Sequence, residues 1–311
     1  MQKPIVVVGS INMDLAVGTQ QIPRVGQTVH GTSFQTFAGG KGANQAVAVA
    51  RLNYPVAMVG CVGADDFGQR LSEGLRTAGV DTSNVRTVNC PSGVALITTN
   101  AKGENNIVVV PGANAELTPA VLEESSSLLA TAGMLLTQLE TPLETVEYLA
   151  AFAKRQGVPL MLDPAPACAL PATLLQNVAW LTPNETEAQT LLQRELRFEA
   201  DTQAAVEELL ARGAKNVLLK LGDKGAVVLQ KSRVMERIAP CKVNAVDTTA
   251  AGDAFNAGFA VSLLRGHSVL QSAEYASAVA ALAVTRPGAQ QSLPMQHEVD
   301  AFLATRKISG R

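Results

Sequence analysis

The sequence lacks an excess of charge of either sign. Its 25 Lys and Arg residues and 27 Asp and Glu residues leave a formal net charge of −2. Without a positive surplus, the surface supplies no attractive field for nucleic acid or for anionic lipid. We therefore expect neither partner, and an anionic ligand would need a local site built for it.

Cysteine and histidine are also scarce. The four cysteines are far apart in sequence and form no CxxC pair: Cys61, Cys90, Cys168 and Cys241. Only three histidines are present, and none lies near another. This excludes the usual zinc-ligand spacings and predicts a reduced, cytoplasmic protein.

Long hydrophobic runs are missing, although 47% of the 311 residues are hydrophobic. No apolar stretch is long enough to span a membrane. The N-terminal MQKPIVVVGS holds only a short apolar run, which predicts a buried strand rather than a secretory signal. The hydrophobic content is therefore available for a large globular core.

Short apolar runs alternate with amphipathic segments along the chain. This alternation predicts an α/β fold with a mostly parallel central sheet and helices on both faces. The expected strands are 5–8, 56–59, 134–139, 159–162, 179–181 and 217–221. The expected helices are 42–52, 69–78, 119–129, 143–156, 186–192, 202–212, 252–264 and 269–285. Because no linker interrupts the pattern, we expect a single domain over residues 1–311.

Two segments interrupt the α/β alternation. Residues 15–37 are rich in Gly, Thr, Gln and Val and have no helical period, and residues 94–110 read as two strands around a polar turn. We expect these insertions to pair into a small second sheet over the main domain. Such a sheet usually serves as a lid or as a dimer surface.

The segment DTTAAGDAF carries the strongest chemical signal. Small residues at Ala250, Ala251 and Gly252 lead into an apolar helix, whose first N–H groups and positive dipole end suit a phosphoryl group. Asp253 would lie in the first turn, where a carboxylate can accept a proton from an attacking hydroxyl. An ordinary acid that stabilises the helix N-terminus explains Asp253 equally well on this segment alone.

A second glycine-rich segment, AGGKGANQA, opens another helix. It is no Walker A loop, and Gln45 stands where a dinucleotide-binding GxGxxG would need its third Gly, so a dehydrogenase is disfavoured. Gly40 lets the backbone approach a ligand, while Lys41 and Asn44 offer donors to hydroxyl oxygens. The alternative is a tight turn with a helix packing contact.

Three further segments carry weaker signals. Asn12 and Asp14 follow the first strand and would face one side of an extended chain, where an amide and a carboxylate can hold a sugar diol, although such residues usually make a turn. Asn184 and Glu187 share a helix face and could hold a hydrated Mg²⁺, although a helix cap is favoured locally. The segment LGDKG after Lys220 could contact a nucleotide or form a plain hairpin.

Taken in order, the segments GSINMD, GGKGANQA, QLE, TPNETE, LGDKG, DTTAAGDAFNAG and VTRPGAQQS resemble the ribokinase family of PfkB-type carbohydrate kinases. The resemblance covers nearly the whole chain. It implies a parallel sheet with helices on both faces and a small β lid that forms a homodimer contact. It also implies transfer of a phosphoryl group from ATP to O5 of D-ribose, giving D-ribose 5-phosphate.

The resemblance implies a role for each matching residue. Asp253 resembles the base, and Ala250, Ala251 and Gly252 resemble the anion hole. The implied sugar contacts are Asn12, Asp14, Gly40, Lys41, Asn44, Glu140 and Asp253. The implied contacts to ATP and Mg²⁺ are Asn184, Glu187, Lys220, Gly222, Gly225 and Ser277. A monovalent-cation site, usually filled by K⁺, is implied at Asp247, Thr249, Ala283, Arg286, Gly288 and Ser292.

The sequence departs from the family pattern at three positions. Lys220 stands where many relatives have Thr or Ser, Ser277 where Asn or His is common, and Asp163 where Asn is frequent. The sugar-contact positions show no departure, which favours ribose, and the Asn12 amide disfavours 2-deoxyribose because it can bond an extra hydroxyl. Another sugar, a nucleoside, or a sensor that binds sugar without phosphorylating it remain the alternatives.

Overall fold

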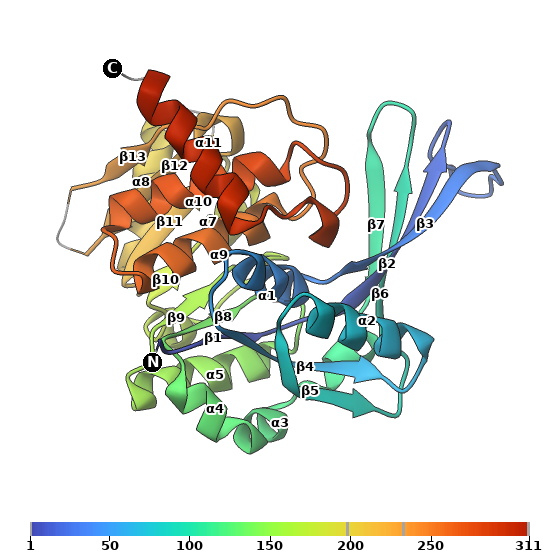
Figure 1. Ribbon diagram of the computed structural model, residues 1–311, viewed down its shortest axis with the longest axis horizontal. Helices are drawn as coiled ribbons and strands as arrows, with labels where there is room; N and C mark the ends of the chain where they lie inside the picture. The colour runs from blue at the N-terminus through green and yellow to red at the C-terminus, as the bar shows by residue number, and fades with distance from the viewer. Residues whose placement is uncertain (1, 197–198, 232–233, 310–311) are drawn as a thin grey trace.

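The computed structural model describes residues 2–196, 199–231 and 234–309. In these ranges the largest element is a sheet with the strand order β13-β12-β11-β10-β9-β8-β1-β4-β5 (Figure 1). Its strands are β1 Ile5–Val8, β4 Val56–Gly63, β5 Asp81–Val88, β8 Met134–Thr137, β9 Leu160–Leu162, β10 Trp180–Leu181, β11 Asn216–Lys220, β12 Ala226–Gln230 and β13 Glu236–Ile238. The strands from β11 to β5 are parallel, and β12 pairs antiparallel with β11 and with β13.

Strand β1 shows why the expected apolar runs form a buried parallel sheet. Ile5 and Val7 point into one hydrophobic core, whereas Val6 and Val8 point into the other. Both faces are therefore covered, as parallel strands require. The predicted α/β fold with a mostly parallel sheet is confirmed.

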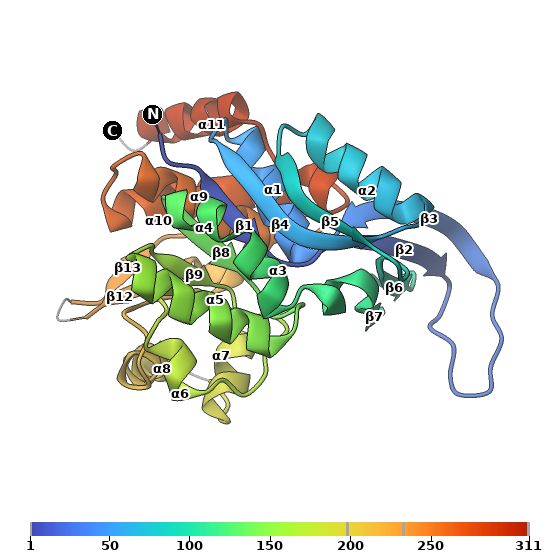
Figure 2. The ribbon, with the colours of Figure 1, turned by 90° about the horizontal axis from the view of Figure 1, so that it is seen from below.

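Helices cover the two faces of the large sheet (Figure 2). One face carries α1 Lys41–Arg51, α2 Asp66–Thr77, α9 Ala251–Leu264, α10 Val269–Ala283 and α11 Gln296–Ser309. The other carries α3 Pro119–Glu124, α4 Ser126–Thr131, α5 Leu143–Gln156, α6 Ala172–Leu175, α7 Glu185–Leu192 and α8 Glu199–Ala211. Among the residues described, none of these helices combines the length and hydrophobicity that a membrane crossing requires.

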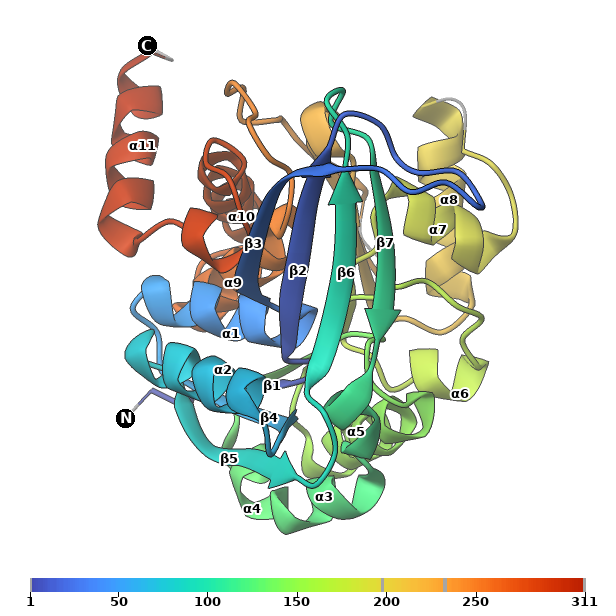
Figure 3. The same ribbon diagram turned by 90° about the vertical axis from the view of Figure 1, so that its right-hand side faces the viewer.

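A separate four-stranded sheet stands beside the large one, with the order β3-β2-β6-β7 (Figure 3). Its strands are β2 Asn12–Thr19, β3 Gly31–Gly39, β6 Gly93–Thr99 and β7 Asn105–Val110. The two β insertions do pair with each other, because β2 lies parallel to β6. Strands β2 and β3 are inserted between β1 and α1, and β6 and β7 follow β5, so the base of the sheet adjoins the carboxyl end of β1.

Some expected boundaries are wrong. The helix expected over residues 119–129 is two helices, because the chain turns at Ser125, whose N–H donates to Leu122 O at 3.1 Å. Ser residues in this stretch compete for backbone hydrogen bonds and weaken a continuous helix. Strands β5 and β13 and helix α11 were not expected, and the strand expected over 134–139 ends at Thr137.

Candidate active site

The N-terminus of α9 forms one wall of the site. Ala250 precedes the helix with φ 60° and ψ 10°, a left-handed conformation that is unfavourable for a residue with a Cβ. This turn brings the chain into α9. Ala251 N donates to Thr248 O at 3.2 Å, whereas the N–H groups that follow it, that of Gly252 first, have no carbonyl in a preceding turn. Small side chains at Ala250, Ala251 and Gly252 leave these groups accessible to an anion.

Asp253 lies in the first turn of α9 and is only 4% exposed. Its carboxylate accepts hydrogen bonds from Asn44 Nδ2 at 2.9 Å and from Gln45 Nε2 at 3.2 Å. Burial raises its pKa to about 6, helped by the negative charge of Asp163, whereas Lys41 and the two amides act in the opposite direction. Two segments, 38–46 and 247–255, therefore meet at this carboxylate, although Gln45 and Asp253 are 208 residues apart in sequence.

Lys41 lies at the start of α1, directly after Gly40, whose φ of 87° favours glycine. A Cβ on Gly40 would stand 2.7 Å from Asn12 N, so the glycine also permits close approach of the two segments. Burial opposes the charged form of the Lys41 ammonium, but nearby carboxylates outweigh it and raise the pKa, Asp253 foremost, followed by Asp163 and then Glu140. The ammonium is therefore charged and faces a ring of acids.

Asn12 and Asp14 stand on β2 at the base of the four-stranded sheet. Asn12 Oδ1 accepts from Asn114 Nδ2 at 2.7 Å, which leaves the Asn12 Nδ2 group as a donor. Two glycines make room for these side chains. A Cβ on Gly93 would lie 2.4 Å from Asn12 Oδ1, and one on Gly39 would lie 2.2 Å from Asp14 Oδ2.

Glu140 follows β8 and faces the same space. Its Oε2 accepts from Ser10 Oγ at 2.5 Å and from Lys41 N at 3.1 Å. The pKa of Asp14 is raised to about 7 by burial, with further contributions from the charges of Glu140 and Asp253. All the expected sugar contacts therefore converge on one region between β2, α1 and α9.

Asn184 and Glu187 form the helix cap that their spacing allowed. Asn184 Oδ1 accepts from Glu187 N at 2.8 Å, and Glu187 Oε2 accepts from Asn184 N at 2.7 Å. Burial raises the pKa of Glu187, while the charge of Lys220 lowers it and that of Asp163 raises it. Asn184 Nδ2 also donates to Glu187 Oε1 at 2.8 Å, so the cap holds this carboxylate near Lys220 and Asp163.

The segment after β11 is the tight hairpin that its glycines suggested. Gly222 and Gly225 have φ values of 58° and 90°, and Leu221 N donates to Gly225 O at 2.8 Å. A Cβ on Gly225 would collide with Ile238 O at 2.0 Å. Ser277 is buried on α10, which packs against β12 and β13.

The residues expected at a cation site are only partly connected. Asp247 Oδ1 accepts from Thr249 N and Oγ1, and its Oδ2 accepts from Gly288 N at 2.8 Å. Burial opposes ionisation of Asp247, but these hydrogen bonds outweigh it and lower the pKa. The other members have different bonds: Arg286 pairs with Glu298, Ser292 Oγ donates to Ala289 O, and the Ala283 carbonyl accepts from Arg286 N.

Several polar residues of the site were not among the expected site residues. Gln45 Nε2 donates to both Asp253 and Asp163, and Gln138 Nε2 donates to Gln45 Oε1 at 2.8 Å. Asn114 supports Asn12 from the segment after β7. Gln45 lay inside a segment already singled out, and Asp163 stood out as a departure. Asn114 had no sequence signal, because its partner lies 102 residues away.

Comparison with known proteins finds matches that cover nearly the whole chain. The model of the pfkB family carbohydrate kinases matches residues 2–296. A ribokinase of Haemophilus influenzae is 40% identical over 306 residues, covering 97% of this chain and 99% of the relative. A deoxyribokinase of Salmonella typhi is 35% identical over 302 residues, with 96% and 98% covered.

Solved structures agree with the fold as well. The structure of Arabidopsis thaliana ribokinase complexed with ribose and ATP has a TM-score of 0.92 and 36% sequence identity, covering 97% of this chain and 99% of that one. The expected family resemblance is confirmed by these matches. The chain belongs to the pfkB family of carbohydrate kinases.

Proposed function

We propose that this protein is an ATP-dependent ribokinase that transfers the γ-phosphoryl group of ATP to O5 of D-ribose. The observation that carries the proposal is the position of Asp253, a buried carboxylate at the N-terminus of α9 that is hydrogen-bonded to the sugar-side residue Asn44. A ribokinase of 40% identity and an Arabidopsis ribokinase complexed with ribose and ATP support the same activity.

In this reaction Asp253 acts as the general base. O5 of ribose attacks the γ-phosphorus, the O5 proton passes to the Asp253 carboxylate, and the bond from phosphorus to the leaving oxygen of ADP breaks. The N–H groups that follow Ala251 at the start of α9, that of Gly252 first, hold the oxygens of the transferring phosphoryl group, and Ala250 shapes the turn that presents them. Their alignment before the reaction avoids reorganisation when charge develops.

The sugar is held by groups of complementary hydrogen-bonding capacity. Asp14 and Glu140 accept from sugar hydroxyls, while Asn12 Nδ2, Lys41 and Asn44 donate to them, and Gly40 allows close backbone contact. A sugar without its 2-hydroxyl would leave the Asn12 donor unpaired. 2-Deoxyribose is the second candidate acceptor, because deoxyribokinases of 35% identity are also relatives.

ATP occupies the adjoining region in this proposal. Gly222, Gly225 and Ser277 surround the nucleotide, and Asn184 with Glu187 lies near its phosphates. Within the described residues no group of three or more His, Cys, Asp or Glu side chains is arranged to hold a metal ion. The acceptors of Asn184 and Glu187 therefore suit Mg²⁺ that keeps most of its waters, and when bound the ion neutralises phosphate charge.

A monovalent cation, K⁺, is proposed on the far side of the α9 loop. The ionised Asp247 carboxylate, with Thr249 beside it, is the charged donor, and hydrogen bonds from Val246 N and Asp247 N to Val284 O already tie this loop to the segment after α10. Ala283, Arg286, Gly288 and Ser292 belong to the second segment. A bound cation would hold the two segments together and thereby order the turn at Ala250.

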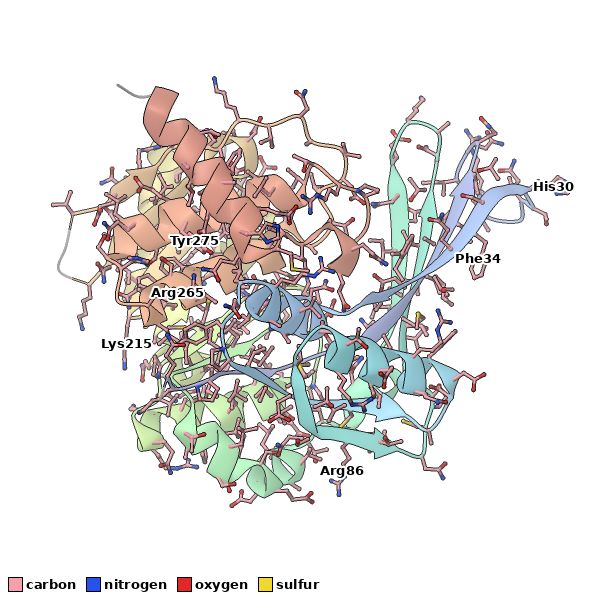
Figure 4. The ribbon with its side chains drawn as sticks, viewed as in Figure 1. His30, Phe34, Arg86, Lys215, Arg265 and Tyr275 are labelled. Atoms are coloured by element: carbon pink, nitrogen blue, oxygen red, sulfur yellow. The ribbon has the colours of Figure 1, made fainter. Side chains whose placement is uncertain are left out.

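We also propose that the four-stranded sheet is a lid of a single-domain enzyme and a homodimer contact. Phe34 is 65% exposed on this sheet, away from the large sheet (Figure 4), and Ile107 and Val108 are more than half exposed. Apolar side chains gathered on one exposed sheet fit an interface between protomers.

A cytoplasmic location is proposed because, in the described ranges, none of the four cysteines is in a disulfide.

The test is ADP release from ATP over a panel of ribose, 2-deoxyribose, fructose and nucleosides, each with and without K⁺. We expect the highest kcat/KM for ribose, at least about tenfold above 2-deoxyribose because of the unpaired Asn12 donor, and stimulation by K⁺. Absence of turnover with ribose rejects the proposal. Ribose binding by calorimetry without ADP release would instead identify a sensor.

A further inference from the structure

A buried ion pair joins two of the residues that depart from the family pattern. Lys220 Nζ lies 2.9 Å from Asp163 Oδ1, and the two side chains are 10% and 4% exposed. Lys220 ends β11, and Asp163 follows β9. Removing two charges from water costs several kcal/mol for each ion, so a pair at this depth is weak support for stability. Strands β9, β10 and β11 are already joined by backbone pairing, and the pair is not needed to order them.

The Lys220 ammonium also faces the anion-binding end of α9. Its Nζ is 3.3 Å from the point that a Cβ on Gly252 would occupy. An ammonium at this distance reaches the same space as the first N–H groups of the helix. It therefore adds a full positive charge to the partial charge of the helix dipole there.

The backbone of Lys220 places it beside the third part of the site. Lys220 N donates to Pro183 O at 2.9 Å, and Lys220 forms a parallel bridge with Asn184. Lys220 is the main positive charge acting on Glu187. The ammonium thus lies between Asp163, the N-terminus of α9 and the Asn184–Glu187 cap.

The hydrogen-bonding capacity of the ammonium is not exhausted by its partner. An ammonium carries three N–H donors, and Asp163 Oδ1 accepts one of them. Asp163 Oδ2 is fixed separately by Gln45 Nε2 at 3.4 Å, so the carboxylate is held from both sides. Two donors of Lys220 therefore remain available to an anion that binds beside Gly252.

We propose that Lys220 is a phosphate-binding cation for the β- and γ-phosphates of ATP, and that Asp163 is the positioning residue that holds its ammonium beside Gly252. The inference rests on the proposed kinase function and deepens it. Lys220 neither gives nor takes a proton in the transfer. It binds negative charge on the oxygens of the triphosphate while Asp253 takes the O5 proton.

The test uses three variants: Lys220→Thr, Asp163→Asn and the double variant carrying both changes. Binding of AMP, ADP and a non-hydrolysable ATP analogue is measured by calorimetry without sugar, and folding by thermal denaturation. For Lys220→Thr we expect affinity for the ATP analogue to fall by about 10- to 100-fold, because a charge-assisted bond is lost, and affinity for AMP to change less than about twofold.

The double variant separates phosphate binding from structural support. Because it leaves no buried charge without a partner, it should melt closer to the wild type than either single variant does. Its affinity for the ATP analogue should stay as low as that of Lys220→Thr. Asp163→Asn should weaken the ATP analogue by less than Lys220→Thr, since the ammonium remains but is no longer held.

Lys215→Thr is the matched control. Lys215 is exposed and directly precedes β11, at the end of the strand opposite to Lys220 (Figure 4). Lys215→Thr therefore makes the same chemical change away from the site and should leave nucleotide affinity unchanged. Equal losses of AMP and ATP-analogue affinity in Lys220→Thr would overturn the proposal, as would recovery of ATP-analogue affinity in the double variant. Because these titrations contain no sugar, a failure of wild-type ribose turnover would reject the proposed acceptor without deciding this result.

Discussion

Replacing Asp253 with Asn should raise stability while abolishing most of the activity. The pKa of this carboxyl rises on folding from 3.8 to about 6, chiefly through burial. A carboxyl group whose pKa is higher in the folded than in the unfolded state stabilises the fold at pH values below its pKa in the unfolded state. This stabilisation is lost as the pH rises through the pKa in the folded state. Because one pKa unit corresponds to about 1.4 kcal/mol, the ionised carboxylate costs the fold on the order of 3 kcal/mol at neutral pH.

Asparagine removes the cost of burying a charge, but it also removes one hydrogen-bond acceptor. Asp253 accepts from both Asn44 and Gln45, whereas the Asn side chain has one oxygen, so one amide donor loses its acceptor at about 1 kcal/mol. We expect a net stabilisation of about 2 kcal/mol above pH 6, which shrinks towards pH 4. If Asp253 is the general base, kcat should fall by at least about 10²-fold while ribose still binds.

Chemical denaturation at pH 4, 5, 6 and 8, together with ADP-release kinetics, would measure both effects. Asp66→Asn is the matched control, because Asp66 is an exposed acid in the first turn of α2. An Asp253 that only stabilises its helix predicts the opposite pair of results: a loss of about 0.3–1 kcal/mol and near-normal kcat. That outcome would refute the assignment.

Three further predictions follow from the same geometry. In wild type, kcat/KM should fall tenfold per pH unit below about 6, because protonated Asp253 cannot accept a proton; a profile flat to pH 5 would contradict this. Gly93→Ala should raise the KM for ribose at least about tenfold, since its Cβ would lie 2.4 Å from Asn12 Oδ1. Gly74→Ala on α2 is the control, because a Cβ there meets nothing within 4 Å, and it should leave the KM values for ribose and for ATP unchanged. Ala250→Gly should raise the free energy of unfolding by about 1 kcal/mol, because glycine adopts the φ of 60° without strain, and a lower melting temperature would contradict this.

The predicted fold was most accurate where burial alone decides the structure. A fully apolar run such as Ile5–Val8 is explained by a sheet that is covered on both faces, and strand β1 has the predicted bounds. Strand β5, Asp81–Val88, was missed because its mixed sequence belongs to an edge strand with partly exposed side chains. Its strand conformation comes from pairing with β4, which local sequence does not report.

The same division holds in the site. Segments that carry several candidate residues together, such as Lys41 with Asn44, were singled out from their own composition, and the structure places both residues near Asp253. The pairing of Asp163 with Lys220 was not, although both residues had been noted, because 57 residues separate them and only the strand order brings them together. Each looked like an isolated departure, whereas the structure shows that the two side chains form one ion pair.

The attachment of the four-stranded sheet has a mechanical consequence. Its strand β2 begins at Asn12 and its strand β3 ends at Gly39, next to the proposed sugar contacts, while His30 lies at the far end of the sheet, directly before β3 begins (Figure 4). In a rigid rotation, displacement grows with distance from the axis. If the sheet pivots at its base, the groups proposed to hold the sugar scarcely move, while the far end of the sheet sweeps a wide arc. A spectroscopic label at position 30 would therefore give a large signal for sugar binding without disturbing the contacts that cause it.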